Sequence, residues 1–97
     1  MNVLWTPEAE ADRAAIVAFI RAENPLAATR MEQRFNRTAG LLIDHPALGR
    51  PGKIAGTREL IPHRSYRLIY EIYEGAVWVL AIVHSARQWP PISEQNR

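Results

Sequence analysis

The sequence contains no cysteine, so the chain can form neither a disulfide bond nor a zinc site with thiolate ligands. Its three histidines, His45, His63 and His84, are not spaced like metal ligands, and we expect no metal and no cofactor. The longest wholly apolar run, residues 76–83, has eight residues, whereas a membrane-spanning helix needs roughly 20. The first residues also lack the basic and apolar regions of a signal peptide. These absences predict a cytoplasmic protein that does not enter a membrane.

Internal repeats and low-complexity tracts are also missing from the 97 residues. With 47% apolar and 23% charged residues, a chain of this length is typical of one globular fold, and we predict a single domain over residues 1–97. The formal net charge of +2 is too small to indicate nucleic-acid binding by itself. From Arg50 to Arg67, however, five basic side chains stand against Glu59 alone, and such a cluster can attract an acidic partner.

Two helix-start signals predict a pair of helices. The pairs Thr6–Pro7 and Asn24–Pro25 each place a capping side chain before a proline at the first helical position. The second helix is expected to end near Asp44. The predicted apolar sides consist of Ile16, Val17, Phe19 and Ile20 in the first helix and Met31, Phe35, Thr38 and Leu42 in the second. Because the link between the helices is short, we expect an antiparallel hairpin.

Strand-like segments lie on both sides of the helices. Residues 2–5 precede them, and residues 58–61, 65–72 and 77–84 follow after a loop rich in glycine and proline. A turn at Glu74–Gly75 joins the last two strands into a hairpin. The order β-α-α-β-β-β indicates an α+β domain in which the helical hairpin packs on one face of a mostly antiparallel sheet.

A turn of two or four residues predicts the register of this last hairpin. It pairs Ile72 with Val77 and places a nearly continuous apolar face against the helices. On the other face, Arg67 and His84 become diagonal neighbours. The same face is expected to carry Ile69, Glu71, Trp78, Leu80 and Ile82. Because the helices cover only one face, we expect the second to bind a partner. The alternative is structural: Arg67 pairs with Glu71, and His84 caps a strand end.

The element order, together with GRPG, TRELI, SYRLIYEI and VHSARQWP, resembles the RelE/ParE toxin superfamily of bacterial type II toxin–antitoxin modules. The resemblance covers about residues 2–90 and implies the RelE/ParE-like fold. It also implies a toxin of a plasmid-stabilization type of system, neutralised by a cognate ParD-like antitoxin. The C-terminal segment of such an antitoxin wraps the toxin, often along the helical hairpin and the sheet.

The superfamily has two main activities, which the resemblance leaves open. RelE-like members cleave messenger RNA on the ribosome, and in that case Arg67, His84 and Arg87 would form the catalytic set. ParE-like members inhibit DNA gyrase. Residues 58–61 lack the lysines common in RelE-like ribonucleases, and the tail after His84 lacks a tyrosine. We therefore expect a ParE-like gyrase inhibitor that is not an enzyme. A ribonuclease and a detoxified remnant that only binds antitoxin are the alternatives.

Partner binding is expected mainly on the strands and the chain end. An acidic, amphipathic antitoxin segment should bind the basic region around Arg58, Arg64 and Arg67. The residues expected to contact antitoxin or target are Arg58, Arg64, Arg67, Glu71, Trp78, Leu80, His84 and Trp89. Trp89 has a second interpretation, in which it anchors the chain end against the domain. Apolar positions on the helices, such as Leu26 and Leu41, are further candidates for antitoxin contact.

Overall fold

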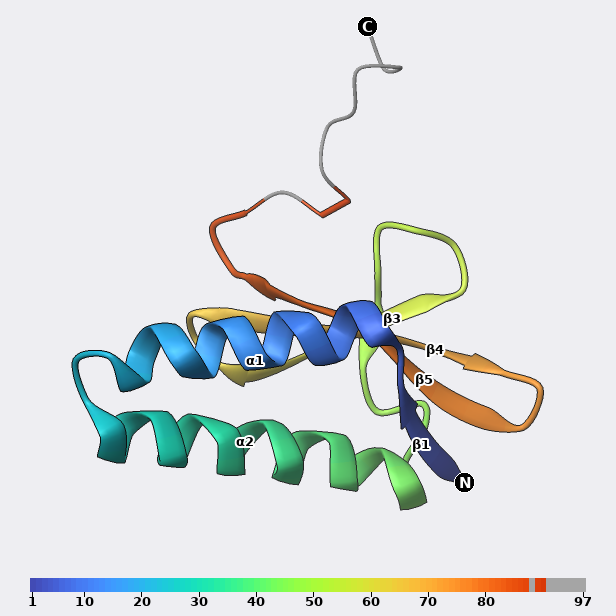
Figure 1. Ribbon diagram of the computed structural model, residues 1–97. Coiled ribbons are helices and arrows are strands. Elements are labelled where there is room, and N and C mark those ends of the chain that lie inside the picture. The colour runs from blue at the N-terminus through green and yellow to red at the C-terminus, as the bar shows by residue number, and fades with distance from the viewer. Residues whose placement is uncertain (88, 91–97) are drawn as a thin grey trace, which may run out of the picture.

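The computed structural model describes residues 1–87, 89 and 90, which form two helices packed on a sheet (Figure 1). The elements are β1 (Asn2–Trp5), α1 (Pro7–Arg21), α2 (Pro25–Asp44), β2 (Arg50–Pro51), β3 (Thr57–His63), β4 (Tyr66–Tyr73) and β5 (Ala76–His84). The strand order is β1-β5-β4-β3-β2, and every neighbouring pair is antiparallel except β1 and β5. The predicted α+β architecture is confirmed. The two-residue strand β2 lies within the segment that the sequence predicts as a loop.

Both predicted helix starts are confirmed. The Thr6 hydroxyl accepts a hydrogen bond from the Ala9 N–H at 3.1 Å, and the Asn24 side chain accepts one from the Ala27 N–H at 3.0 Å. Each cap satisfies a backbone donor that has no partner inside the helix. The helix α2 also ends at Asp44, as predicted. No helix in the described part of the chain is both long and apolar enough to span a membrane.

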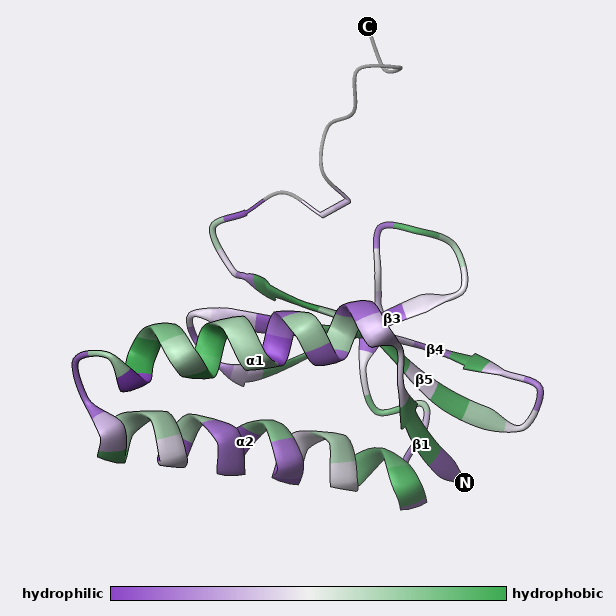
Figure 2. Cartoon of the chain, viewed as in Figure 1, coloured by the Kyte–Doolittle hydropathy of each residue, from purple (hydrophilic) through white to green (hydrophobic). Residues whose placement is uncertain are grey.

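The helices pack on one face of the sheet, and the main core lies between the helices and this face. Figure 2 shows hydrophobic and hydrophilic bands alternating along both helices, while β5 is hydrophobic over most of its length. The stripe predicted for α2 is confirmed, with Phe35 and Leu42 fully buried. In α1, Val17 is buried but Phe19 is 74% exposed, so Phe19 is wrongly placed by the prediction. The two positions lie about 200° apart around the helix axis.

The turn between β4 and β5 has the predicted two-residue form. Glu74 and Gly75 both have positive φ angles, 48° and 75°, as a tight hairpin turn of the primed type requires. The pairing follows the predicted register as far as Tyr70 opposite Val79. The register then shifts through a β-bulge, because the next residue of β4, Ile69, pairs with Ala81. Leu80 is the extra residue.

The bulge places Arg67 and His84 on opposite faces, so the prediction of a shared face is wrong. Arg67 pairs with Val83, and His84 pairs with Tyr66. The Tyr66 ring packs edge-on against Phe35 of α2, with 5.9 Å between ring centroids. Tyr66 and its strand partner His84 therefore lie on the helix side of the sheet. Arg67 lies on the far face. One extra residue in a strand with a two-residue repeat reverses the face of every side chain beyond it.

Candidate partner-binding surfaces

Arg67 is buried in an ion pair on the sheet face away from the helices. Its side chain is 11% exposed, and its Nη1 lies 3.3 Å from Oε1 of Glu59, whose side chain is 4% exposed. Its Nη2 donates to the backbone carbonyl of Arg87 at 2.7 Å. The Nη2 of the more exposed Arg50 lies 3.6 Å from the same Glu59 oxygen. The guanidinium is thus neutralised by the chain itself, and its partner is Glu59 rather than the predicted Glu71.

The C-terminal segment covers part of this far face. Trp89 packs against the buried cluster of Ile69, Ala81 and Val83. The predicted anchoring role of Trp89 is therefore confirmed. The prediction of a wholly open second face is wrong in this region, because Ile69 lies under Trp89 and Ile82 belongs to the helix-side core.

His84 and Arg87 are exposed on the helix side of the sheet. The His84 Nδ1 accepts a hydrogen bond from the Ala86 N–H at 3.1 Å, so the predicted strand-end cap is confirmed. Both residues line a hollow of about 260 Å³ beside α1, together with Tyr66 and Phe19. Arg67 is not among the lining residues. The structure therefore does not bring the three predicted catalytic side chains together.

The arginines at 58, 64 and 67 do not form the single basic patch that the sequence predicts. Arg58 pairs with Tyr70 on the helix side, and its Nη1 donates to the carbonyl of Gly49 at 2.7 Å. Arg67 is buried on the far face, and of the three only Arg64 is exposed. Two of the three guanidinium groups therefore hold the fold together.

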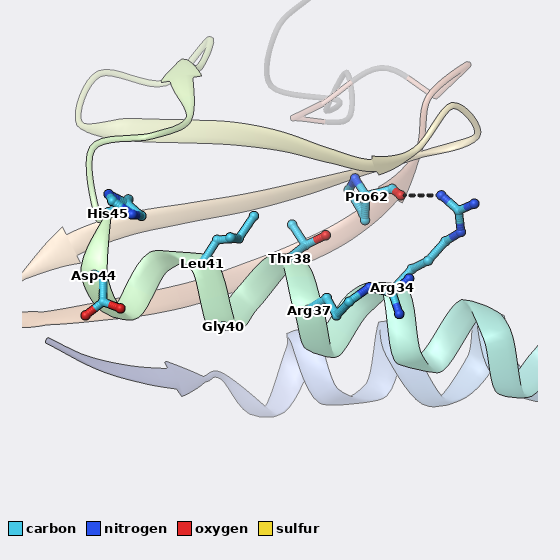
Figure 3. A pocket seen from close by; sticks show the side chains of 8 residues that line it. All are labelled: Arg34, Arg37, Thr38, Gly40, Leu41, Asp44, His45 and Pro62. Atoms are coloured by element: carbon cyan, nitrogen blue, oxygen red, sulfur yellow. Dashed lines mark hydrogen bonds between the residues drawn. The ribbon is translucent and has the colours of Figure 1, made fainter.

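A groove of about 490 Å³ lies between α2 and β3, with side chains from both elements facing it (Figure 3). It is lined by Arg34, Arg37, Thr38, Gly40, Leu41, Asp44, His45 and Pro62. Arg34 spans the groove, since its Nη1 donates to the Pro62 carbonyl at 3.2 Å. We call this hollow the cationic groove, because its described lining residues include two arginines and one carboxylate.

The basic character of this side extends along α2. Leu26, Arg30, Arg34, Arg37 and Leu41 follow one another at steps of four or three, which places them on one side of the helix, and all are exposed. Among the described residues, none of these arginines forms a salt bridge. The sequence prediction missed Arg34 and Arg37, although their spacing was a visible signal.

The same positive region affects His63 at the end of β3. The pKa of His63 lies below its usual range, mainly because the ring is partly buried. The positive charges of the nearby Arg34 and Arg64 guanidinium groups lower it further. Its Nδ1 accepts a hydrogen bond from the Ser65 N–H at 3.0 Å, which requires an unprotonated nitrogen. His63 is therefore neutral near pH 7, and the positive charge of this side comes from its arginines.

Glu71, Trp78 and Leu80 share one face, as predicted. Trp78 pairs with Glu71 of β4 on one side and with Leu4 of β1 on the other. All of these side chains line one hollow at the outer end of the hairpin, away from the part that Trp89 covers. Among the described residues, no cluster of three metal-binding side chains is present.

Comparisons with known proteins identify the family. The model of the ParE toxin of type II toxin–antitoxin systems, parDE, matches residues 3–89. The chain is 39% identical over 86 residues to Toxin RelE2 of Caulobacter vibrioides, covering 89% of this chain and 97% of that protein. It is 35% identical over 92 residues to Y4kP of Sinorhizobium fredii, covering 94% and 95%.

Solved structures share the fold. A chromosomal ParDE system from P. aeruginosa matches with a TM-score of 0.77 at 24% identity, covering 87% of this chain and 95% of that chain. A YoeB/ParE toxin from Agrobacterium tumefaciens matches with a TM-score of 0.63 at 17% identity, covering 87% and 98%. The resemblance seen in the sequence is confirmed. The chain belongs to the ParE toxin family of type II toxin–antitoxin systems, within the RelE/ParE superfamily.

Proposed function

We propose that this toxin inhibits DNA gyrase and does not cleave RNA. The observation that supports this proposal is the separation of the candidate nuclease residues. RNA cleavage needs a base and a phosphate-binding cation that reach the same reacting atoms. Here Arg67 is paired with Glu59 and held by the Arg87 carbonyl, while His84 lies on the opposite face. Because Glu59 already neutralises the Arg67 guanidinium, the carboxylate opposes the binding of a phosphate at this arginine.

The purified toxin is expected to block supercoiling by DNA gyrase and to leave a defined message intact on translating ribosomes. Because His84 is an exposed strand-end cap, His84→Ala should change the half-inhibitory concentration by less than about tenfold. A ribonuclease that lost its general base would lose on the order of 10²-fold in rate. Supercoiling gels and primer extension on the message measure the two activities side by side.

Toxin mixed with its antitoxin serves as the inactive control in both assays. Message cleaved by the toxin alone, and lost on His84→Ala, would contradict the proposal and favour the RelE-like alternative. A third result, with neither activity and normal growth when the toxin is expressed alone, would indicate a detoxified remnant.

We further propose that the cognate antitoxin places an acidic, amphipathic segment along α2, with acidic side chains in the cationic groove. Arg34 and Arg37 supply the complementary charge, and the exposed Leu26 and Leu41 supply apolar contacts on the same side of the helix. An amphipathic segment on such a surface buries its apolar side chains against the exposed leucines and places its carboxylates beside the arginines. The strand arginines are less suitable, because Arg67 is buried.

Charge reversal at the groove is expected to weaken antitoxin binding. Arg37→Glu puts a carboxylate where an acidic partner must approach, and the dissociation constant should rise by at least about tenfold. Arg64→Glu makes the same charge change at an exposed site outside the groove and should raise it by less than about threefold. Titration calorimetry with the antitoxin's C-terminal segment, at low and high salt, measures both. A larger loss of affinity for Arg64→Glu than for Arg37→Glu would instead indicate that the antitoxin segment binds near the β3–β4 turn.

A further inference from the structure

A second groove lies at the outer end of the β4–β5 hairpin, and we call it the hairpin groove. Its volume is about 410 Å³. It is lined by Leu4, Thr6, Glu71, Tyr73, Glu74, Ala76, Trp78 and Leu80. Val3 and Val77 pair with each other and belong to the helix-side core, so the next residues, Leu4 and Trp78, point to the far face. In Figure 1 the turn of this hairpin projects beyond the start of α1.

The β-bulge at Leu80 forms one wall of this groove. Thr6 is bonded to the bulge from the end of β1: its N–H donates to the Val79 carbonyl at 3.0 Å, and its hydroxyl donates to the Leu80 carbonyl at 3.3 Å. Bulges commonly redirect a side chain beside a functional site. The hydrogen bonds hold this irregular strand segment in one conformation, so the groove is formed before any partner arrives.

The groove presents aromatic and apolar side chains to the surface. Trp78 lies between Leu4 and Glu71 in a row that crosses three strands. Tyr73 and Leu4 are exposed, although both are large and apolar enough to be buried in a core. Apolar surface gathered in a groove with a polar rim indicates a site for another molecule.

The charge of this groove is opposite to that of the cationic groove. Of the residues that the structure describes, the charged ones that line it are Glu71 and Glu74, with no lysine or arginine among them. Among the described residues, neither carboxylate forms a salt bridge. A cation placed over an indole ring gains cation–π stabilisation, and arginine is enriched at the centres of interfaces. The chemistry therefore selects a basic ligand.

We propose that the hairpin groove binds a basic, arginine-containing segment of a partner protein, with a guanidinium over Trp78 between the carboxylates of Glu71 and Glu74. An acidic antitoxin segment has the wrong charge for this site. We therefore assign the basic segment to the toxin's target, and this assignment rests on the proposed function.

A pentapeptide of alternating leucine and arginine, blocked at both ends, tests the groove without any target protein. The indole N–H signal of Trp78, identified through Trp78→Phe, should shift on titration in ¹H–¹⁵N spectra. Glu71→Gln with Glu74→Gln should weaken peptide binding by about tenfold. Glu10→Gln with Glu23→Gln removes the same charge from exposed positions elsewhere and should weaken it by less than twofold. An unmoved Trp78 signal, or equal losses in both double variants, would overturn the inference.

The supercoiling assay tests the assignment to the target. The Glu71→Gln, Glu74→Gln variant should inhibit gyrase at least about tenfold less than the wild type, with Glu10→Gln, Glu23→Gln unchanged. Equal inhibition by the two variants would overturn the assignment. A wild-type toxin that binds the peptide but leaves supercoiling intact would contradict the proposed function, while the peptide result would still support the groove as a site for basic segments.

Discussion

Replacing Glu59 with glutamine is expected to lower the free energy of unfolding by about 3–5 kcal/mol. The substitution keeps the shape of the side chain but leaves the buried Arg67 guanidinium without its 3.3 Å counter-ion. An uncompensated buried charge costs far more than the loss of a surface pair. Urea denaturation followed by tryptophan fluorescence measures the change, provided that the m-value stays constant.

Glu71→Gln is the matched control, because it removes a carboxylate from the same sheet face where no salt bridge is formed within the described residues. Its effect should stay within about 0.5 kcal/mol. Replacing both members of the pair, Glu59→Leu with Arg67→Met, should restore most of the lost stability, because apolar side chains of similar volume can replace a buried ion pair. A loss below about 1 kcal/mol for Glu59→Gln would mean that the pair behaves like a solvated one.

Truncating Phe35 to alanine is expected to cost about 3–5 kcal/mol, a large fraction of the stability of a domain this small. Phe35 is fully buried and joins α2 to the sheet through its edge-on contact with Tyr66. The substitution leaves a cavity beneath α2, the helix along which we propose that the antitoxin binds. Thermal and urea unfolding of the variant measure the loss.

The chain supplies its own control for this experiment, since Phe19 is the only other phenylalanine and is 74% exposed. Phe19→Ala removes the same group from the surface of α1 and should change stability by no more than about 0.5 kcal/mol. Similar losses in the two variants would show that burial of Phe35 is not what stabilises the contact between helix and sheet.

Local signals predicted the elements of this fold well. Thr6 and Asn24 cap their helices through bonds that reach only three residues along the chain, so the sequence around them contains the whole cause. The same holds for the turn at Glu74–Gly75, whose short loop fixes the first pairs of the hairpin. Glu71 and Trp78 lie close to this turn, and their shared face was predicted correctly.

Features that depend on distant segments were not predicted. No glycine or proline marks the bulge at Leu80, and the bonds to this strand segment come from Thr6, more than 70 residues away. Arg67 and His84 lie beyond the bulge, so their shared face was predicted incorrectly. The pairing of Arg67 with Glu59 likewise depends on how β3 aligns with β4, which a single segment does not reveal.

The extra residue at Leu80 also affects how this chain aligns with any relative whose matching strand has no bulge. A strand without a bulge matches β5 only if a one-residue gap is opened at this position. If the gap is omitted, Ala81 to His84 are each matched to a side chain on the opposite side of the relative's sheet. Functional roles near the end of β5 are therefore better transferred from superposed coordinates than from position in an ungapped alignment.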